Sequence, residues 1–140
     1  MSGAREQARS AAIRLVRALL DNDIAELEEL FDDTVLQAGG RQNLSRGEVV
    51  KECTKQVGRQ GWNADTEVGE VLDLSRLEAG QAGDERPSTP LPQGIRPTDI
   101  VVDLVFFPAA SRPFFFCLER ANQPVRIFLR PGLRPTIVSF

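Results

Sequence analysis

The sequence predicts an α+β fold, in which three N-terminal helices pack on a curved antiparallel sheet to form a cone-like domain. Three observations carry this prediction. Apolar residues recur at helical spacing in the first part of the chain, and beyond Trp62 the hydrophobic period changes to two, as in strands. The length of 140 residues is typical of one domain, so residues 1–140 are expected to form a single unit with its own core.

Capping residues mark the expected helices. The first helix is expected over about 4–21, where apolar residues recur every three or four positions. Asp23 and Glu26 then form a capping-box pattern that opens a short second helix. Ser45 and Glu48 form the same pattern at the start of a third helix, which is expected to end at a glycine.

The remaining segments are expected to be strands and one long loop. Strands are expected at about 34–37, 66–74, 99–107, 114–120, 125–130 and 136–140. Residues 75–97 contain four prolines and three glycines and no periodicity. We interpret them as a long flexible loop between strands.

The strand register predicts two unlike faces of the sheet. Pairing Arg120 with Val125 places Glu119 opposite Arg126, and an acid across from a base supports this register. Phe116 then meets Leu129, and Leu118 meets Ile127, on an almost wholly apolar face. Alternate residues of 99–107 extend that face, which we expect to pack against the helices.

The opposite face mixes aromatic and charged side chains. Its residues are Asp103, Phe107, Phe115, Cys117, Glu119, Arg126, Phe128 and Arg130, and parity also places Asp99, Val101 and Val105 on it. Such a face is too polar for a core and too apolar for ordinary solvent exposure. We therefore predict that it forms the interface of a homodimer. The alternative is a partly exposed face shielded by the loop at 75–97.

The residue types available restrict the chemistry. The chain has no histidine and no tyrosine, which are frequent acid–base groups. Asp103 is the single candidate catalytic acid or base, because it lies within an apolar run, although its parity places it on the predicted dimer face. Cys53 and Cys117 form no CxxC motif and are too few to hold zinc. We expect no metal site and no cofactor.

Composition narrows the expected partners and location. A net charge of −3, with arginines spread along the chain, does not favour nucleic acid. The opening MSGAREQARS lacks the apolar segment of a signal peptide, and no apolar stretch is long enough to span a membrane. We expect a cytoplasmic protein that binds neither nucleic acid nor membranes.

Three short runs carry a resemblance to a known family. They are LLDND at 19–23, LEELFDD at 27–33 and SRGEVV at 45–50. Together with the order of helices and strands, they resemble the nuclear transport factor 2-like superfamily, the α/β cone that includes polyketide cyclases. The resemblance implies a sheet curled around the helices to form a conical pocket, and a homodimer through the opposite face. It also implies either an enzyme with an Asp and His or Tyr partners in the pocket, or a noncatalytic binding protein.

Five apolar residues are expected to line or fill this pocket: Phe31, Trp62, Leu104, Phe106 and Phe116. The predicted inner face carries no ionisable residue except Arg120 near its end, so we expect a noncatalytic homodimer that binds a protein partner or a small apolar ligand. Two alternatives stay open. One is a small-molecule isomerase, dehydratase or hydrolase that uses Asp and Arg, and the other is an accessory or assembly factor acting through the loop at 75–97.

Overall fold

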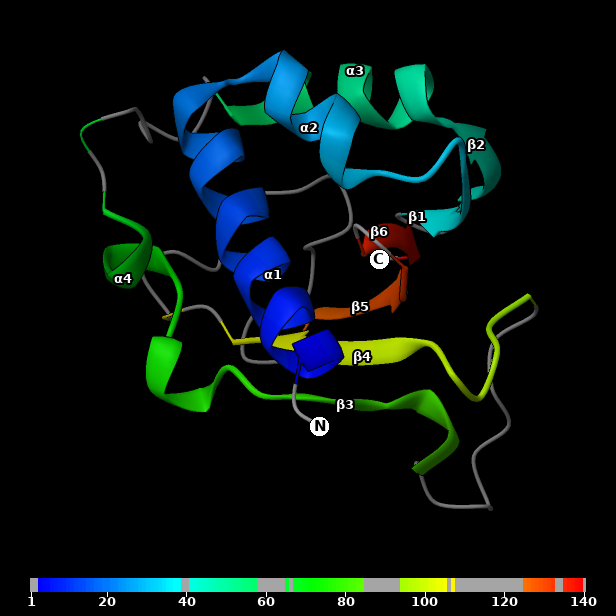
Figure 1. The fold of residues 1–140 in the computed structure, drawn as a ribbon. Coiled ribbons are helices and arrows are strands. Elements are labelled where there is room, and N and C mark those ends of the chain that lie inside the picture. The colour runs from blue at the N-terminus through cyan, green and yellow to red at the C-terminus, as the bar shows by residue number, and fades with distance from the viewer. Residues whose placement is uncertain are drawn as a thin grey trace.

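The fold is a six-stranded sheet with helices packed on one face (Figure 1). This computed structural model describes residues 3–38, 41–57, 65, 67–84, 94–105, 107, 125–132 and 135–139. The helical elements are α1 (Gly3–Asp21), α2 (Ile24–Leu30), α3 (Arg46–Val57), α4 (Val68–Val71), and the 3₁₀ turns η1 (Leu74–Arg76) and η2 (Ala82–Asp84). The strands are β1 (Thr34–Ala38), β2 (Arg41–Ser45), β3 (Ala79–Gln81), β4 (Ile100–Leu104), β5 (Val125–Arg130) and β6 (Thr136–Ser139).

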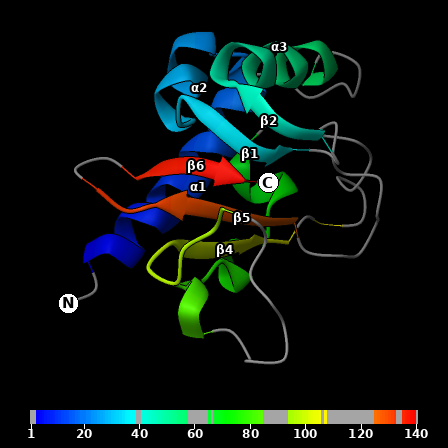
Figure 2. The ribbon, with the colours of Figure 1, turned by 90° about the vertical axis from the view of Figure 1, so that its right-hand side faces the viewer.

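The strands follow the order β2-β1-β6-β5-β4-β3. Figure 2 shows the strands from β2 to β4 in this order, and Figure 1 shows β3 beside β4. Strands β1 and β6 are parallel, and the other neighbouring strands are antiparallel. The α+β class is therefore confirmed, but the sheet is mixed, because the last strand inserts beside β1 in the same direction. The β1–β2 hairpin also separates α2 from α3, so the finer prediction of three N-terminal helices on an antiparallel sheet is not confirmed.

Side chains fix the starts of the helices, as the sequence predicted. The Asp23 carboxylate accepts a hydrogen bond from the Glu26 amide at 3.2 Å. The Ser45 hydroxyl accepts from the Glu48 amide at 3.3 Å and donates to the Glu48 carboxylate at 3.1 Å. Asn22 ends α1 with a φ of 53°, a left-handed conformation that asparagine tolerates better than most residues. Both N-cap predictions are confirmed.

The predicted strand at 66–74 is wrong, because the part that the structure describes forms α4 and η1. Glu67 and Glu70 form a reciprocal capping box around the first turn of α4. The Asp73 carboxylate accepts from the Ser75 amide at 3.2 Å and so caps η1. These local bonds between side chains and backbone compete with the extended conformation that apolar alternation suggested.

The segment 75–97 is not one continuous loop. Strand β3 lies within it and pairs antiparallel with β4, with Ala79 opposite Val102 and Gln81 opposite Ile100. The 3₁₀ turns η1 and η2 flank β3. Three residues are too few to show alternation, so hydrophobic periodicity does not predict this strand. Residues 85–93 lie outside the described residues.

Strands β4, β5 and β6 confirm the strands predicted near 99–107, 125–130 and 136–140. Leu129 of β5 has Ile100 on one side and Ile137 on the other, so its predicted pairing with Phe116 is wrong. The predicted strand at 114–120 lies outside the described residues. The short separation between 114–120 and β5 in sequence suggested a hairpin, whereas β5 takes its neighbours from β4 and β6.

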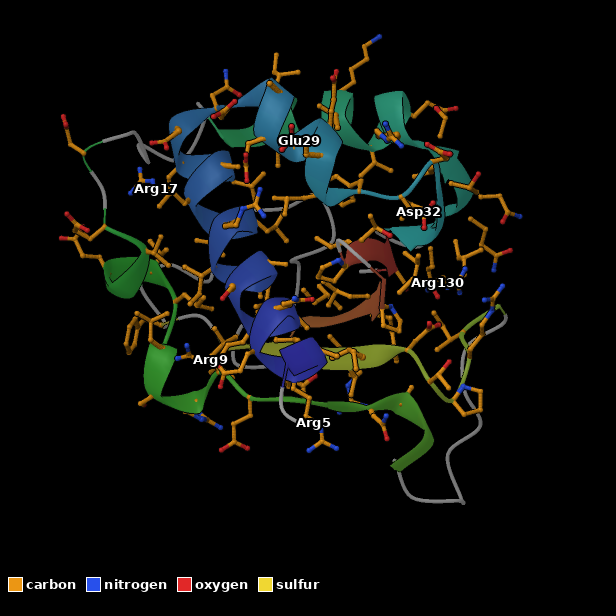
Figure 3. All side chains as sticks on the ribbon, in the orientation of Figure 1. Arg5, Arg9, Arg17, Glu29, Asp32 and Arg130 are labelled. Atoms are coloured by element: carbon orange, nitrogen blue, oxygen red, sulfur yellow. The ribbon has the colours of Figure 1, made fainter. Side chains whose placement is uncertain are left out.

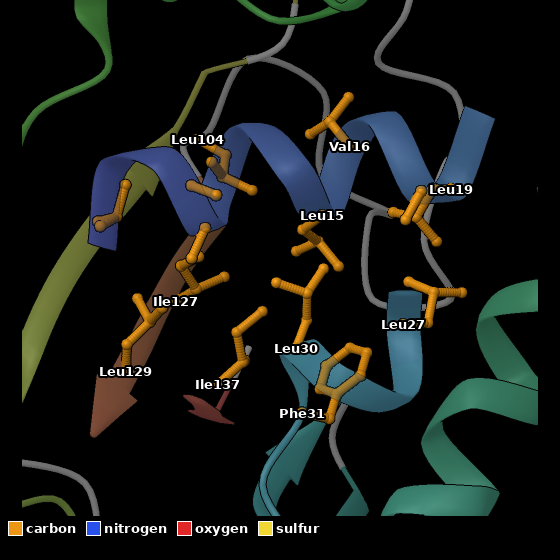
Figure 4. Packing of buried hydrophobic residues seen from close by; sticks show 14 of the residues in the cluster. Leu15, Val16, Leu19, Leu27, Leu30, Phe31, Leu104, Ile127, Leu129 and Ile137 are labelled. Atoms are coloured by element: carbon orange, nitrogen blue, oxygen red, sulfur yellow. The ribbon is translucent and has the colours of Figure 1, made fainter. Parts of the chain in front are cut away.

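The main core lies between the helices and the inner face of the sheet (Figure 4). It includes side chains from α1 and α2, namely Leu15, Val16, Leu19, Leu27 and Leu30, and from the sheet, namely Ile100, Val102, Leu104, Ile127, Leu129 and Ile137. The sheet residues alternate along β4 and β5, as a face buried by helices requires. The predicted apolar face is confirmed for its residues in β4 and β5, whereas Phe106, Phe116 and Leu118 lie outside the described residues.

Candidate functional site

The outer face of the sheet is covered by the chain itself. Residues 94–99, here called the strap, precede β4 and cross this face in front of β5 (Figure 2). Ile95 of the strap and Ala82 of η2 form a small cluster with Val101, Phe128 and Val138. These five residues are no more than 8% exposed. The strap therefore shields an apolar patch that would otherwise face solvent.

A buried ion pair holds the strap on the sheet. Asp99, which is 0% exposed, accepts from Arg130 Nε at 3.3 Å and from Arg130 Nη2 at 3.2 Å. Arg130 Nη2 also donates to the Gly94 carbonyl at 3.1 Å, and the Arg96 amide donates to Asp99 at 2.8 Å. We call the pair of Asp99 and Arg130 the clamp. It joins both ends of the strap to β5.

The electrostatic environment keeps Arg130 charged. The hydrogen bonds to Asp99 raise the pKa of the Arg130 guanidinium, burial opposes this rise, and the negative charges of Asp99 and Asp32 add to it. Figure 3 shows Arg130 and Asp32 close together beside β1. The Asp32 carboxylate also accepts from the Thr136 hydroxyl at 3.0 Å. This end of the sheet therefore holds its charges in mutual contacts.

Glycine is required where the strap meets β1. Gly94 has a φ of 86°, and a Cβ there would lie 2.8 Å from the Leu36 side chain. Any larger residue would combine backbone strain with a steric clash. The close approach places the strap as a wall over the β1–β2 hairpin.

An outer cavity of about 280 Å³ lies between this wall and the hairpin. Its lining residues are Leu36, Gln37, Gln42, Asn43, Gly94, Ile95 and Ser139. No ionisable side chain is among them, and the polar members are three carboxamides and one hydroxyl. Within the described part of the chain, the side chains of Gln37, Gln42, Asn43 and Ser139 form no hydrogen bond.

Two of these residues are unusual. Ser139 is only 5% exposed as a residue, and its side chain forms no hydrogen bond within the described residues. Asn43 has a φ of 55° in the middle of β2, and the β1–β2 ladder pairs residues on both sides of it but not Asn43 with Leu36. Unusual polar groups and backbone conformations of this kind concentrate at functional sites.

The predicted pocket residues that the structure describes lie in the filled core. Phe31 is 1% exposed and Leu104 is 0% exposed, and both belong to the main core (Figure 4). Phe31 also borders a shallow groove of about 440 Å³ beside α2. Trp62, Phe106 and Phe116 lie outside the described residues.

The predicted dimer residues differ in accessibility. Asp103 and Arg126 lie opposite each other on β4 and β5, and their side chains pair in two hydrogen bonds of 2.8 and 3.0 Å. Both are partly exposed, as is Phe107 at 38%. Phe128, at 6%, is already covered within the chain.

The other predicted dimer contacts are only partly described. Phe128 has Val101 and Ser139 as strand neighbours, so its predicted pairing with Cys117 is wrong. Arg130 belongs to the clamp rather than to an open surface. Phe115, Cys117 and Glu119 themselves lie outside the described residues. Shielding of the outer face by 75–97, the alternative to a dimer, matches what the strap does there.

A second groove lies between α1 and α2. It has a volume of about 490 Å³ and is lined by Glu6, Gln7, Ser10, Ala11, Arg14, Glu29, Leu30 and Pro135. Arg14 pairs with Glu26 and lies 3.8 Å from Glu29, so its charge is satisfied within the protein. Among the described residues, no group of three or more Cys, Asp or Glu side chains could hold a metal ion. No described helix has the length and apolar character needed to cross a bilayer.

Few local sequence signals indicate the outer cavity. Strand β2 reads RQNLS, which lacks the β-branched and aromatic residues that usually indicate a strand. Asp99 was placed on the outer face by parity, but its partner Arg130 is 31 positions away. The one local signal was Gly94 within the proline-rich segment, which marks a sharp change of direction.

Comparison with known proteins identifies no family for this chain. No protein-family model and no curated protein sequence matches the chain, so its candidate site is defined by the structure alone.

Proposed function

We propose that this chain is a noncatalytic binding protein that holds a segment of a partner protein in the outer cavity. One observation carries the proposal. The described residues that line the cavity offer three carboxamides and one hydroxyl without partners among the described residues, and none of these lining residues is ionisable. Such a lining can recognise a polar surface but offers no general acid, base or charged nucleophile.

Two carboxylates of the outer face support a binding role over an enzymatic one. Asp99 is committed to Arg130, and Asp103 is committed to Arg126. A catalytic carboxylate must instead be free to exchange a proton with a substrate. The enzyme alternative, which relied on Asp103, therefore has less support.

The filled core favours a protein partner over a small apolar ligand. An apolar ligand needs an open apolar space, whereas Phe31 and Leu104 are closed off by neighbouring side chains. The outer cavity is smaller than the two grooves beside the helices, and its polar groups suit the surface of another chain.

The relation to the nuclear transport factor 2-like superfamily is part of the proposal. Two helices, a hairpin, a third helix and then the rest of the sheet follow one another, and α1 lies across one face of the sheet (Figure 1). This order supports a cone-like fold. The homodimer stays a prediction, and Asp103, Phe107 and Arg126 form its accessible described surface.

Selection of peptides from a random display library tests this function. We expect the selected peptides to shift the NMR signals of the Leu36 and Ile95 methyl groups and of the Gln42 side-chain amide. Gln42→Ala should weaken their binding, because it removes one lining carboxamide. Gln7→Ala is the matched control, since Gln7 lines the groove between α1 and α2, and it should leave binding unchanged.

Two results would contradict the proposal. In the first, the selected peptides shift signals elsewhere and bind Gln42→Ala as tightly as the original chain. In the second, xenon, which enters empty apolar cavities, shifts the methyl signals of Leu104 and Ile127. That result would show an open pocket beneath the sheet and restore the enzyme alternative.

A further inference from the structure

We infer that the surface around α2 binds a basic segment of a partner protein, with one long basic side chain on each side of Glu29. This inference goes beyond the proposed function, because the outer cavity shares no lining residue with this surface. The surface consists of the groove between α1 and α2, here called the first groove, and the shallow groove beside α2, here called the second groove.

The two grooves adjoin at the end of α2. Glu29 lines both of them. Leu30 lines the first groove, and the next residue, Phe31, lines the second. Pro135 and Thr136 are divided in the same way. Because neighbouring residues line the two grooves, whose volumes are about 490 and 440 Å³, one extended segment can occupy both at once.

Carboxylates outnumber arginines at the first groove. Glu6 is exposed and forms no ion pair or hydrogen bond within the described residues. Arg14 is the only cationic residue among the described lining residues, and its Nε donates to Glu26 Oε1 at 2.6 Å. Glu29 is left with a contact of 3.8 Å to Arg14. The surroundings of this groove thus hold three carboxylates and one guanidinium, and they attract a further cation.

The second groove has a similar excess of negative charge. Glu28 lies beside Glu29 in its lining, is exposed, and forms no ion pair or hydrogen bond within the described residues. Arg46 is the only cationic residue in the part of the lining that the structure describes, and it pairs with the Asp33 carboxylate. A basic segment is therefore attracted along both grooves, whereas an acidic segment is repelled.

Apolar side chains form the base of each groove. Ala11 and Leu30 are buried in the first groove, and Phe31 is buried in the second. Lysine and arginine pack their methylene stems on apolar surface and keep their charged ends at its edge. An apolar base with a carboxylate rim therefore matches a long basic side chain. A wholly apolar segment would strip water from the rim carboxylates without supplying a counter-charge, which is costly.

Titration with a blocked arginine, followed by NMR, tests whether a basic side chain enters each groove. The probe is N-acetylarginine N-methylamide, and its uncharged counterpart of nearly the same shape is N-acetylcitrulline N-methylamide. We expect millimolar binding of the arginine probe, with shifts in the methyl signals of Ala11 and Leu30 in the first groove and of Ala25 and Thr136 in the second. The citrulline probe should bind at least about fivefold more weakly.

Peptides with two arginines test whether the grooves act together. Separating the arginines by one to four alanines presents the two basic side chains at different spans. We expect one of these peptides to bind at least about tenfold more tightly than the blocked arginine, because its second arginine binds within the same complex. The peptide of equal length with two citrullines should show no such gain.

Variants of exposed residues separate local recognition from overall charge. Glu6→Gln and Glu29→Gln should each weaken binding of the arginine probe by about two- to fivefold without loss of thermal stability. Glu78→Gln is the matched control, since Glu78 is an exposed glutamate that lines neither groove, and it should bind the probe normally. Arg14→Gln should tighten binding, because it removes a competing cation and frees Glu26.

Each of the following results would overturn the inference. The arginine and citrulline probes bind equally, or Glu78→Gln weakens binding as much as Glu6→Gln does. The arginine probe shifts the methyl signals of Leu36 and Ile95, which line the outer cavity, instead of those in the grooves. No spacing of two arginines improves on the blocked arginine, or putrescine, which also carries two positive charges, binds more tightly than every peptide. None of these results bears on display-selected peptides in the outer cavity, so the proposed function is tested separately.

Discussion

The two faces of the sheet are covered through different interactions. On the inner face, α1 packs on β4 and α2 packs on β6, and buried apolar side chains fill the space between helices and sheet (Figure 4). On the outer face, the strap covers a smaller apolar cluster and is fixed by the clamp. Apolar packing is non-directional and fills space, whereas an ion pair fixes a few atoms and leaves gaps between them. This difference explains why the outer cavity forms beside the strap.

The contrast also separates stability from recognition. Burial of large apolar side chains supplies most of the folding free energy, so the inner face should dominate stability. Exposed carboxamides contribute little to folding, and in the proposed function they provide the directional contacts of recognition. The inner face is therefore expected to tolerate substitution poorly, and the outer face to tolerate it without unfolding.

Removal of a core side chain should have the largest effect. Leu104→Ala deletes most of a side chain that is 0% exposed, and we expect a loss of about 2–5 kcal/mol in the free energy of unfolding. Denaturation by urea measures this loss. A loss below about 1 kcal/mol would mean that Leu104 borders an open space, because a cavity already present adds no new void.

Removal of the clamp should have the next largest effect. Arg130→Met leaves the buried Asp99 carboxylate without its counter-charge, and we expect a loss of about 3 kcal/mol. Hydrogen exchange should accelerate at the amides of Ile95 and Asp99 more than at those of the inner core. Arg126→Met is the matched control, because it removes an arginine from the same strand in an exposed pair.

The pH dependence of the clamp follows from the raised pKa of Arg130. A group whose pKa is raised on folding stabilises the protein below its unfolded pKa and loses this contribution only as pH rises through the folded pKa. Since arginine is charged far above neutrality, Arg130 stays charged throughout. Strap protection should thus not weaken through Arg130 between roughly pH 6 and pH 9. If protection of the strap weakened over this pH range in the original chain but not in Arg130→Met, this account of the clamp would be wrong.

Particular residues show what the sequence could predict. The inner face followed from the parity of Val102, Leu104 and Ile127, and the helix starts followed from Asp23 and Ser45, because both signals are local. Local signals did not extend to contacts between distant segments.

The clamp and the outer cavity depend on such distant contacts. Asp99 and Arg130 meet only after β4 and β5 pair, and Gln42 meets Gly94 only after the strap crosses the sheet. The parity rule placed Asp99 and Arg130 on one face but could not show that the chain covers this face itself. A surface that looked suited to a second subunit is, in the described residues, partly occupied by the strap.

Loss of the ion pair between Asp103 and Arg126 should have the smallest effect on the free energy of unfolding. This pair and the clamp lie on the same face of the sheet, so comparing them tests whether burial makes the clamp strong. The geometry of the pair of Asp103 and Arg126 is better than that of the clamp, with distances of 2.8 and 3.0 Å, but its side chains are 36% and 42% exposed. Water screens exposed charges and holding two long side chains costs entropy, so a double-mutant cycle of Asp103→Asn and Arg126→Gln should give a coupling of about 0.2–1 kcal/mol. If the coupling exceeded the cost of Arg130→Met, burial would not be what distinguishes the clamp. The strap would then be held mainly by the apolar contact of Ile95 with its cluster.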